Sequence, residues 1–206
     1  MNAVSATPDL ANLQRIAVKV FVATDSTITA RDVIPVFHRW IQTGAVNGLP
    51  IDVANYSHLP TGPCVLLVGH EGHYVLDRTE GRLGVQYNRK QPLEGELADR
   101  LLSITRHVVR AARLLEADAS LSTPVRFLGN EVEIVAQDRL LAPNSDETLV
   151  EFRPALDPLL TRWSGNTDWT VSRQSGPRAP FRVAAVTKGT DTLENVETRL
   201  FESSNC

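Results

Sequence analysis

Hydrophobic residues recur along the chain with two spacings, and each spacing predicts one kind of element. Runs of roughly four to eight residues rich in Val, Ile, Leu and Phe are typical of strands. The predicted strands are Ile16–Ala23, Ile51–Ser57, Cys64–Gly69, His73–Asp77, Arg82–Asn88, Val125–Leu128, Glu131–Gln137, Trp169–Arg173 and Phe181–Thr187. Apolar residues spaced by three and four predict four helices. One ends at Gly44, a long one runs over Pro92–Asp118, a third ends near Trp163, and a short one carries Leu193, Val196 and Leu200.

The ends of two predicted helices carry capping residues. Thr29 and Asp32 fit a capping box, in which the Thr29 hydroxyl accepts a hydrogen bond from a free amide of the first turn. Gly44 is a natural end for that helix, because glycine adopts the left-handed conformation at no steric cost. Asn144 or Ser145 is expected to cap the helix that ends near Trp163.

Three short segments that contain glycine predict hairpin turns. His70-Glu71-Gly72 and Thr79-Glu80-Gly81 join the strands of a meander within Ile51–Arg89. In both we expect a three-residue loop whose glycine is left-handed. Gly129-Asn130 is a two-residue hairpin signal, and a hairpin there would place apolar residues of the two flanking strands opposite each other.

The order of the elements predicts an α+β fold with a mixed, largely antiparallel sheet and helices packed on one side. Ile16–Ala23 and Ile51–Ser57, with a helix between them, predict a parallel pair joined by a right-handed crossover. We interpret residues 1–206 as a single domain, with halves 16–90 and 125–187 joined by a long helix at 92–118, and a polar tail at 188–206.

A short repeated motif predicts an internal duplication of a β-α-β-β unit. Pro35-Val36-Phe37-His38-Arg39-Trp40 matches Pro158-Leu159-Leu160-Thr161-Arg162-Trp163 at the proline, the arginine and the tryptophan. Three identities also arise by chance, so the duplication depends on the shared order of strand, helix, strand and strand around each motif. If the halves are related, Trp40 and Trp163 are equivalent residues that are both buried in the core.

Composition and charge narrow the class of protein. The chain of 206 residues is 42% hydrophobic and 22% charged, which is ordinary for a folded soluble protein. Its formal net charge of −3 gives no basic field to attract nucleic acid or an anionic membrane. Its two cysteines form no disulfide framework, and we find neither a secretory signal nor the roughly 20 apolar residues of a membrane span. We therefore expect a cytoplasmic protein that binds neither nucleic acid nor membrane.

The arginines of the long helix do not change this view. Arg106, Arg110 and Arg113 lie late in the helix and its carboxylates lie early, an order that complements the helix dipole. We interpret the arginine row as a solvated face rather than a nucleic-acid stripe.

His70 and His73 are the candidates for a metal site. A two-residue turn at Glu71-Gly72 would place the two imidazoles opposite each other, where they could share a divalent cation. That turn would force Glu71 to positive φ, which a residue with a side chain resists. The three-residue loop places Gly69 opposite His73 instead, and no third ligand is fixed by spacing. We therefore predict no metal and no other cofactor, with His70 and His73 as the alternative.

Polar residues follow both strands of the predicted parallel pair. Asp25 and Ser26 follow the first strand, and Asn55, Ser57 and His58 follow the second. Because the carboxyl ends of parallel strands meet at one edge of a sheet, we expect these side chains to line a common ligand site. Together they donate and accept hydrogen bonds, as recognition of a small molecule requires. The simpler interpretation of the same residues is that they only cap a helix and form turns.

No complete set of catalytic residues is apparent. The chain contains neither a Gly-x-Ser-x-Gly elbow nor a phosphate-binding or dinucleotide-binding glycine pattern. We therefore predict a non-catalytic small-molecule-binding or assembly module, with a second copy of the chain or another protein as partner. The alternative is a small metal-dependent enzyme that uses the His70/His73 turn, so enzymatic activity is left open.

Overall fold

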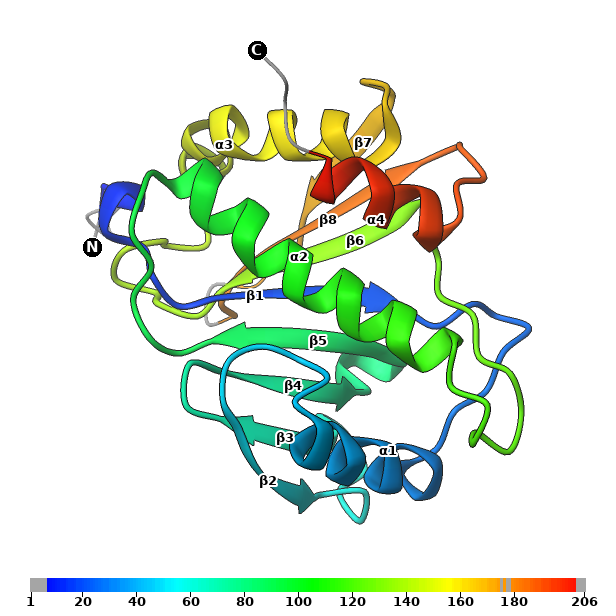
Figure 1. The fold of residues 1–206 in the computed structure, drawn as a ribbon. Coiled ribbons are helices and arrows are strands. Elements are labelled where there is room, and N and C mark those ends of the chain that lie inside the picture. Colours follow the sequence, from blue (N-terminus) through cyan, green and yellow to red (C-terminus); the bar gives the residue numbers. More distant parts are fainter. Residues whose placement is uncertain (1–6, 175, 177–178, 203–206) are drawn as a thin grey trace.

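One eight-stranded sheet, covered on one face by helices, organises the chain (Figure 1). The computed structural model describes residues 7–174, 176 and 179–202. The strands are β1 (Ile16–Phe21), β2 (Pro50–Asn55), β3 (Pro63–Gly69), β4 (Gly72–Asp77), β5 (Gly84–Arg89), β6 (Glu131–Ala136), β7 (Trp169–Arg173) and β8 (Phe181–Thr187). The helices are α1 (Ala30–Thr43), α2 (Leu97–Glu116), α3 (Asp146–Ser164) and α4 (Leu193–Phe201), with 3-10 turns η1 (Leu10–Asn12) and η2 (Thr79–Gly81).

The strands lie in the order β2-β3-β4-β5-β1-β6-β8-β7, and every neighbouring pair is antiparallel. This arrangement confirms the α+β class with helices packed against an open sheet. The predicted parallel pair is wrong, because β5, β4 and β3 lie between β1 and β2. Short connections favour pairing between consecutive strands. The meander β2-β3-β4-β5 therefore folds back along its own length and brings β5, not β2, beside β1.

β1 is the centre of the sheet and is buried along its whole length. Ile16, Val18 and Val20 belong to the hydrophobic core that the helices cover. Lys19 alternates with them and therefore lies on the opposite face, where it is 1% exposed. Its ammonium donates to the Asp77 carboxylate (2.6 Å) and to the Arg82 carbonyl (2.7 Å), so this buried charge is paired.

The predicted helix caps are confirmed, but the long helix begins at Leu97 and not at the predicted Pro92, because Gly95 ahead of it is left-handed at φ 88°. Thr29 and Asp32 form both hydrogen bonds of a capping box at the start of α1, and Gly44 ends the helix in the left-handed conformation at φ 62°. Ser145 caps α3 by accepting from the amide of Thr148. These ends depend on contacts between residues close in sequence, which is why the pattern alone could locate them.

Both tryptophans of the repeated motif are buried, at 3% exposure for Trp40 and 0% for Trp163. Their surroundings differ in detail. Trp40 packs edge-on against Tyr74 of β4, whereas the indole N–H of Trp163 donates to the Gly129 carbonyl at 2.7 Å. The structure does not show the internal duplication, and β4 and β5 separate β3 from β1 in the sheet, whereas β8 and β6 are direct neighbours.

The predicted hairpin at Gly129-Asn130 is wrong. Residues 126–128 run beside the end of β1, where Leu128 donates to the Phe21 carbonyl, and β6 continues along the same strand in the same direction. Gly129 and Asn130 therefore interrupt a line of pairing and do not reverse the chain. A Cβ atom on Gly129 would lie 2.1 Å from the Asp191 carbonyl oxygen, so glycine is required for this close approach.

Both Glu-Gly turns also differ from the predicted three-residue loops. Gly69 and Gly72 belong to β3 and β4, so His70 and Glu71 alone form the first turn. The second connection spans the six residues between Asp77 and Gly84, which pair with each other, and both Glu80 (φ 59°) and Gly81 (φ 76°) are left-handed in it. Within the described part of the chain, no helix combines the length and apolar character needed to cross a membrane.

Candidate functional site

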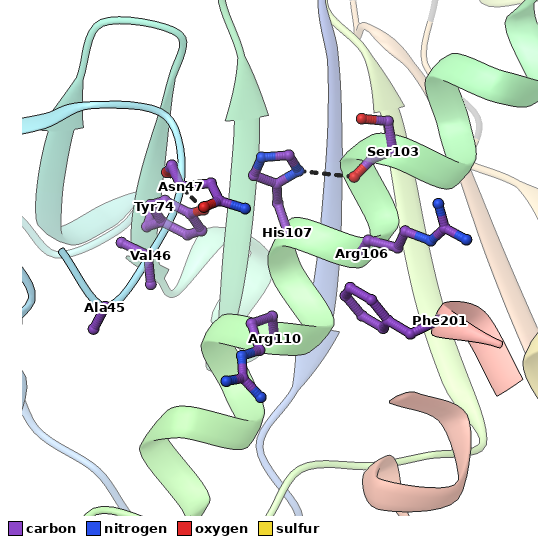
Figure 2. Close-up of a pocket in the computed structure, with 9 residues that line it drawn as sticks. All are labelled: Ala45, Val46, Asn47, Tyr74, Ser103, Arg106, His107, Arg110 and Phe201. Atoms are coloured by element: carbon purple, nitrogen blue, oxygen red, sulfur yellow. Dashed lines mark hydrogen bonds between the residues drawn. The ribbon is translucent and has the colours of Figure 1, made fainter. Parts of the chain in front are cut away.

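A cavity of about 350 Å³ lies on the helical face of the sheet, against α2 (Figure 2). One wall is a polar stripe on α2, in which Ser103, Arg106, His107 and Arg110 are spaced by three and four residues. The lining is completed by Ala45, Val46 and Asn47 after α1, Tyr74 of β4, and Phe201 at the end of α4.

The connection between α1 and β2 is held in place beside this cavity. The Tyr74 hydroxyl donates to the Asn47 carbonyl at 3.0 Å. The amides of His70 and Glu71 donate to the carbonyls of Leu49 and Gly48, which both have positive φ. The turn between β3 and β4 therefore fixes this wall of the cavity through backbone hydrogen bonds. Burial raises the pKa of the Tyr74 hydroxyl above its ordinary value, so Tyr74 acts as a neutral donor.

His107 lies with its ring stacked on Tyr87, at a centroid distance of 4.6 Å and an interplanar angle of 13°. Its Nδ1 lies 2.8 Å from the Ser103 carbonyl oxygen. A carbonyl only accepts, so Nδ1 carries the hydrogen and Nε2 of the neutral ring is an acceptor. Burial, the largest influence, lowers the pKa of His107 below its ordinary value. The imidazole is consequently neutral at pH 7.

Arg106 has no carboxylate partner within the described residues. Its Nε donates to the Leu200 carbonyl at 2.8 Å, and its guanidinium carbon lies 5.5 Å from the centroid of the Phe201 ring. Burial first, and then the positive charge of Arg162, lower the pKa of the Arg106 guanidinium, which nevertheless stays charged near neutral pH. Arg110 differs, because its guanidinium forms an ion pair with Glu197 at 3.1 Å.

The hydrogen bond between His107 and Ser103 does not form a pair of nucleophile and base. The His107 imidazole hydrogen-bonds to the backbone carbonyl of Ser103 and not to its hydroxyl, so this bond does not activate the hydroxyl as a nucleophile. The cavity instead combines a cation, a neutral imidazole acceptor and aromatic rings. Figure 2 shows Phe201 next to Arg106 and Arg110, with Asn47 and Tyr74 on the other side of His107. A planar ligand with one negative group matches these surfaces.

The structure does not bring the predicted ligand-site residues together by strand pairing. β1 and β2 are four strand spacings apart, about 19 Å. The Ser26 hydroxyl accepts from the amide of Arg126, and Asp25 is exposed. Asn55 accepts from the amide of Ser57 through its side chain, and His58 is exposed with its ring 6.5 Å from Tyr56. Ligand binding by these five residues stays a prediction, without the geometric reason that suggested it.

The histidine turn adopts neither the two-residue turn at Glu71-Gly72 nor the three-residue loop. Nδ1 of His73 accepts from the amide of Gly69 at 3.2 Å, and His70 is exposed in the turn itself. Burial, followed by the charge of Lys90, lowers the pKa of His73. Among the residues that the structure describes, no group of three His, Cys, Asp or Glu side chains is arranged to hold a metal ion.

Sequence reasoning missed the cavity residues because it assigned the arginines of α2 to one solvated face. Arg113 does form ion pairs, with Glu116 and two residues of α4, but Arg106 is half-buried and, within the described residues, donates to a backbone carbonyl rather than to a carboxylate. The spacing of Ser103, Arg106, His107 and Arg110 was the one available signal. It indicates a polar stripe on a helix, but it does not reveal that other segments close over that stripe.

Comparison of the chain with protein-family models, with curated proteins and with solved structures finds no match.

Proposed function

We propose that this protein is a non-catalytic small-molecule-binding module whose cavity on α2 takes a small planar organic anion. The observation that carries the proposal is Arg106, a half-buried cation without a carboxylate partner in the described part of the chain. A partly desolvated charge is costly unless it is paired, and the neighbouring Arg162 adds repulsion. A bound carboxylate would supply the missing negative charge through charge-assisted hydrogen bonds.

The size and lining of the cavity support a ligand of modest dimensions. A volume of about 350 Å³ is near the lower end of the roughly 300–1,000 Å³ that small-molecule sites occupy. Phe201 and His107 offer flat surfaces on which an aromatic or otherwise planar body can pack. The Nε2 acceptor of His107 favours a ligand that also carries a donor group. The negative group is expected near Arg106 and the planar body near Phe201.

Three probes of one shape separate charge recognition from simple filling of the cavity. Benzoate, benzamide and benzamidinium share a ring and differ in the charge of the attached group, which is negative, neutral and positive. By isothermal titration we expect benzoate to bind with a dissociation constant of about 1 mM, as its few atoms allow. Benzamide should bind more weakly, and benzamidinium should not bind.

Two substitutions assign the binding to this cavity. Arg106→Gln should weaken benzoate binding by at least about tenfold, because it removes a charge-assisted hydrogen bond worth roughly 1.5–3 kcal/mol. Arg31→Gln is the matched control, since Arg31 is an exposed arginine on α1 outside the cavity lining. Equal binding of the three probes, or equal losses in the two variants, would contradict the proposal.

A further inference from the structure

The two edge strands of the sheet are protected to different degrees. β2 begins with Pro50, its pairing with β3 shifts register between Pro50 and Asp52, and the Asp52 carboxylate is exposed on it. A proline, a bulge and a charge are the devices by which proteins prevent an edge strand from pairing with another chain. β7, at the other edge, pairs with β8 in an unbroken register from Trp169 to Arg173. Its residues 170–172 contain no proline, bulge or charged side chain.

The hydrogen bonds of β7 show which backbone groups face outward. The amide of Gln174 donates to the Arg182 carbonyl. Along an antiparallel strand every second residue bonds to the same neighbour, so Ser172 and Thr170 also direct their backbone groups toward β8. Val171 and Arg173 therefore direct their backbone groups away from the sheet. A further strand could pair with these groups without disturbing the hydrogen bonds between β7 and β8.

We propose that β7 is a self-association surface on which a second copy of this chain pairs antiparallel about a two-fold axis at Val171. This register places Val171 opposite its own copy, with their outward amides and carbonyls bonded to each other. It places Thr170 opposite Ser172, a favourable cross-strand pair, and Trp169 opposite Arg173, where a cation can lie against an aromatic ring. No like charges oppose each other anywhere along the strand.

The neighbouring flank of α3 carries the same self-complementarity. Arg173 forms an ion pair with Asp146, and a small cavity between α3 and β7 is lined by Arg153 and Trp169, so this flank lies beside the edge. Val150 lies four residues after Asp146 and three before Arg153, so it shares a side of α3 with them, and it is 71% exposed. If the two-fold axis at Val171 also passes near Val150, it sets Arg153 of one copy against Glu147 of the other, since both lie three residues from Val150. An apolar centre flanked by opposite charges favours a second copy over an unrelated partner.

Sedimentation velocity over a concentration series tests the proposal with two matched variants. Val150→Lys should raise the dissociation constant of the dimer by at least about tenfold, because two lysines meet at the axis. Ile51→Lys introduces the same charge at a residue of similar exposure, 63%, on the opposite edge, and should leave the dimer unchanged. Circular dichroism of both variants checks that they remain folded.

A third variant tests the pairing of the strands themselves. Val171→Pro removes an amide that faces outward, so it should abolish the dimer while β7 stays paired with β8. A wild-type chain that is monomeric at every concentration overturns the proposal, even if a strand from another protein binds at β7. A dimer that survives Val150→Lys but is lost in Ile51→Lys would place the interface at β2 and overturn it equally.

Discussion

At the scale of single residues, His107 illustrates how burial sets the chemistry of the cavity. Its ring lies between Tyr87 and the cavity, and the helix carbonyl of Ser103 fixes its tautomer. The neutral ring accepts a hydrogen bond and adds no charge next to Arg106. Protonation of His107 would instead place a second positive charge beside Arg106.

The lowered pKa of His107 makes stability depend on pH in a defined direction. In the unfolded chain the imidazole titrates near its ordinary pKa of about 6.5, whereas in the folded protein it takes up a proton only at lower pH. Below about pH 6.5 the unfolded state therefore binds more protons. The stability that the neutral ring contributes is fully present above this pH and is lost as the pH falls toward the folded pKa.

We predict that the wild type loses unfolding free energy between about pH 7 and about pH 5 more steeply than His107→Phe, whose ring keeps the stacking but does not titrate. Urea denaturation at several pH values measures the difference. His73 also has a lowered pKa, but it is present in both proteins and its effect cancels in the comparison. Parallel curves for the two proteins would show that burial of His107 does not shift its titration.

At the scale of elements, the sequence predicted the capped helix ends well and the reversals of the chain poorly. Thr29, Ser145 and Gly44 act on amides or carbonyls within a few residues, so their roles follow from local pattern. Gly129-Asn130 has the composition of a turn, yet the chain continues in the same direction through it, and it only interrupts the pairing with β1. The cause is not local, because the indole of Trp163 and the backbone at residues 191–192 both contact Gly129.

Gly129 is therefore predicted to tolerate no side chain. Gly129→Ala places a Cβ atom 2.1 Å from the Asp191 carbonyl oxygen, so the backbone ahead of α4 has to move. We expect a loss of about 1–3 kcal/mol in unfolding free energy, the usual cost of overpacking. Gly189→Ala is the control, because its Cβ atom would meet only Thr187 at an ordinary distance of 3.8 Å. Equal stabilities of the two variants would argue against the tight approach at Gly129.

At the scale of the whole molecule, the candidate site and the sheet both depend on contacts between distant segments. The cavity combines residues 45–47, 74, 103–110 and 201, which are far apart in the sequence, so no local pattern groups them. The parallel strand pair on which the predicted site was based is absent for a related reason. The prediction assumed that two strands joined by a helix are neighbours, whereas the intervening meander filled the place beside β1. Strand order in an antiparallel sheet is set by which apolar faces are covered together, which periodicity does not encode.

The central position of β1 predicts that both ends of the sheet unfold together. β1 pairs with β5 on one side and β6 on the other, and α2 packs across β1 and β5 while also contacting α3 and α4. Trp40 and Trp163 lie in α1 and α3, over opposite ends of the sheet. Variants that retain only one of these tryptophans, with the others changed to Phe, report each end by fluorescence during urea denaturation. We expect coincident transitions in the two variants.

Adding Leu67→Ala to each single-tryptophan protein makes this test decisive. Leu67 is fully buried in β3, where it pairs with Tyr74, the residue against which Trp40 packs, and β3 lies far along the sheet from β7 and β8. Removing its side chain should cost about 2–5 kcal/mol, as other large-to-small core substitutions do. If the sheet unfolds as one unit, the transitions reported by Trp40 and by Trp163 shift to lower urea by the same amount. A shift seen only by Trp40 would instead show that the two ends of the sheet unfold independently.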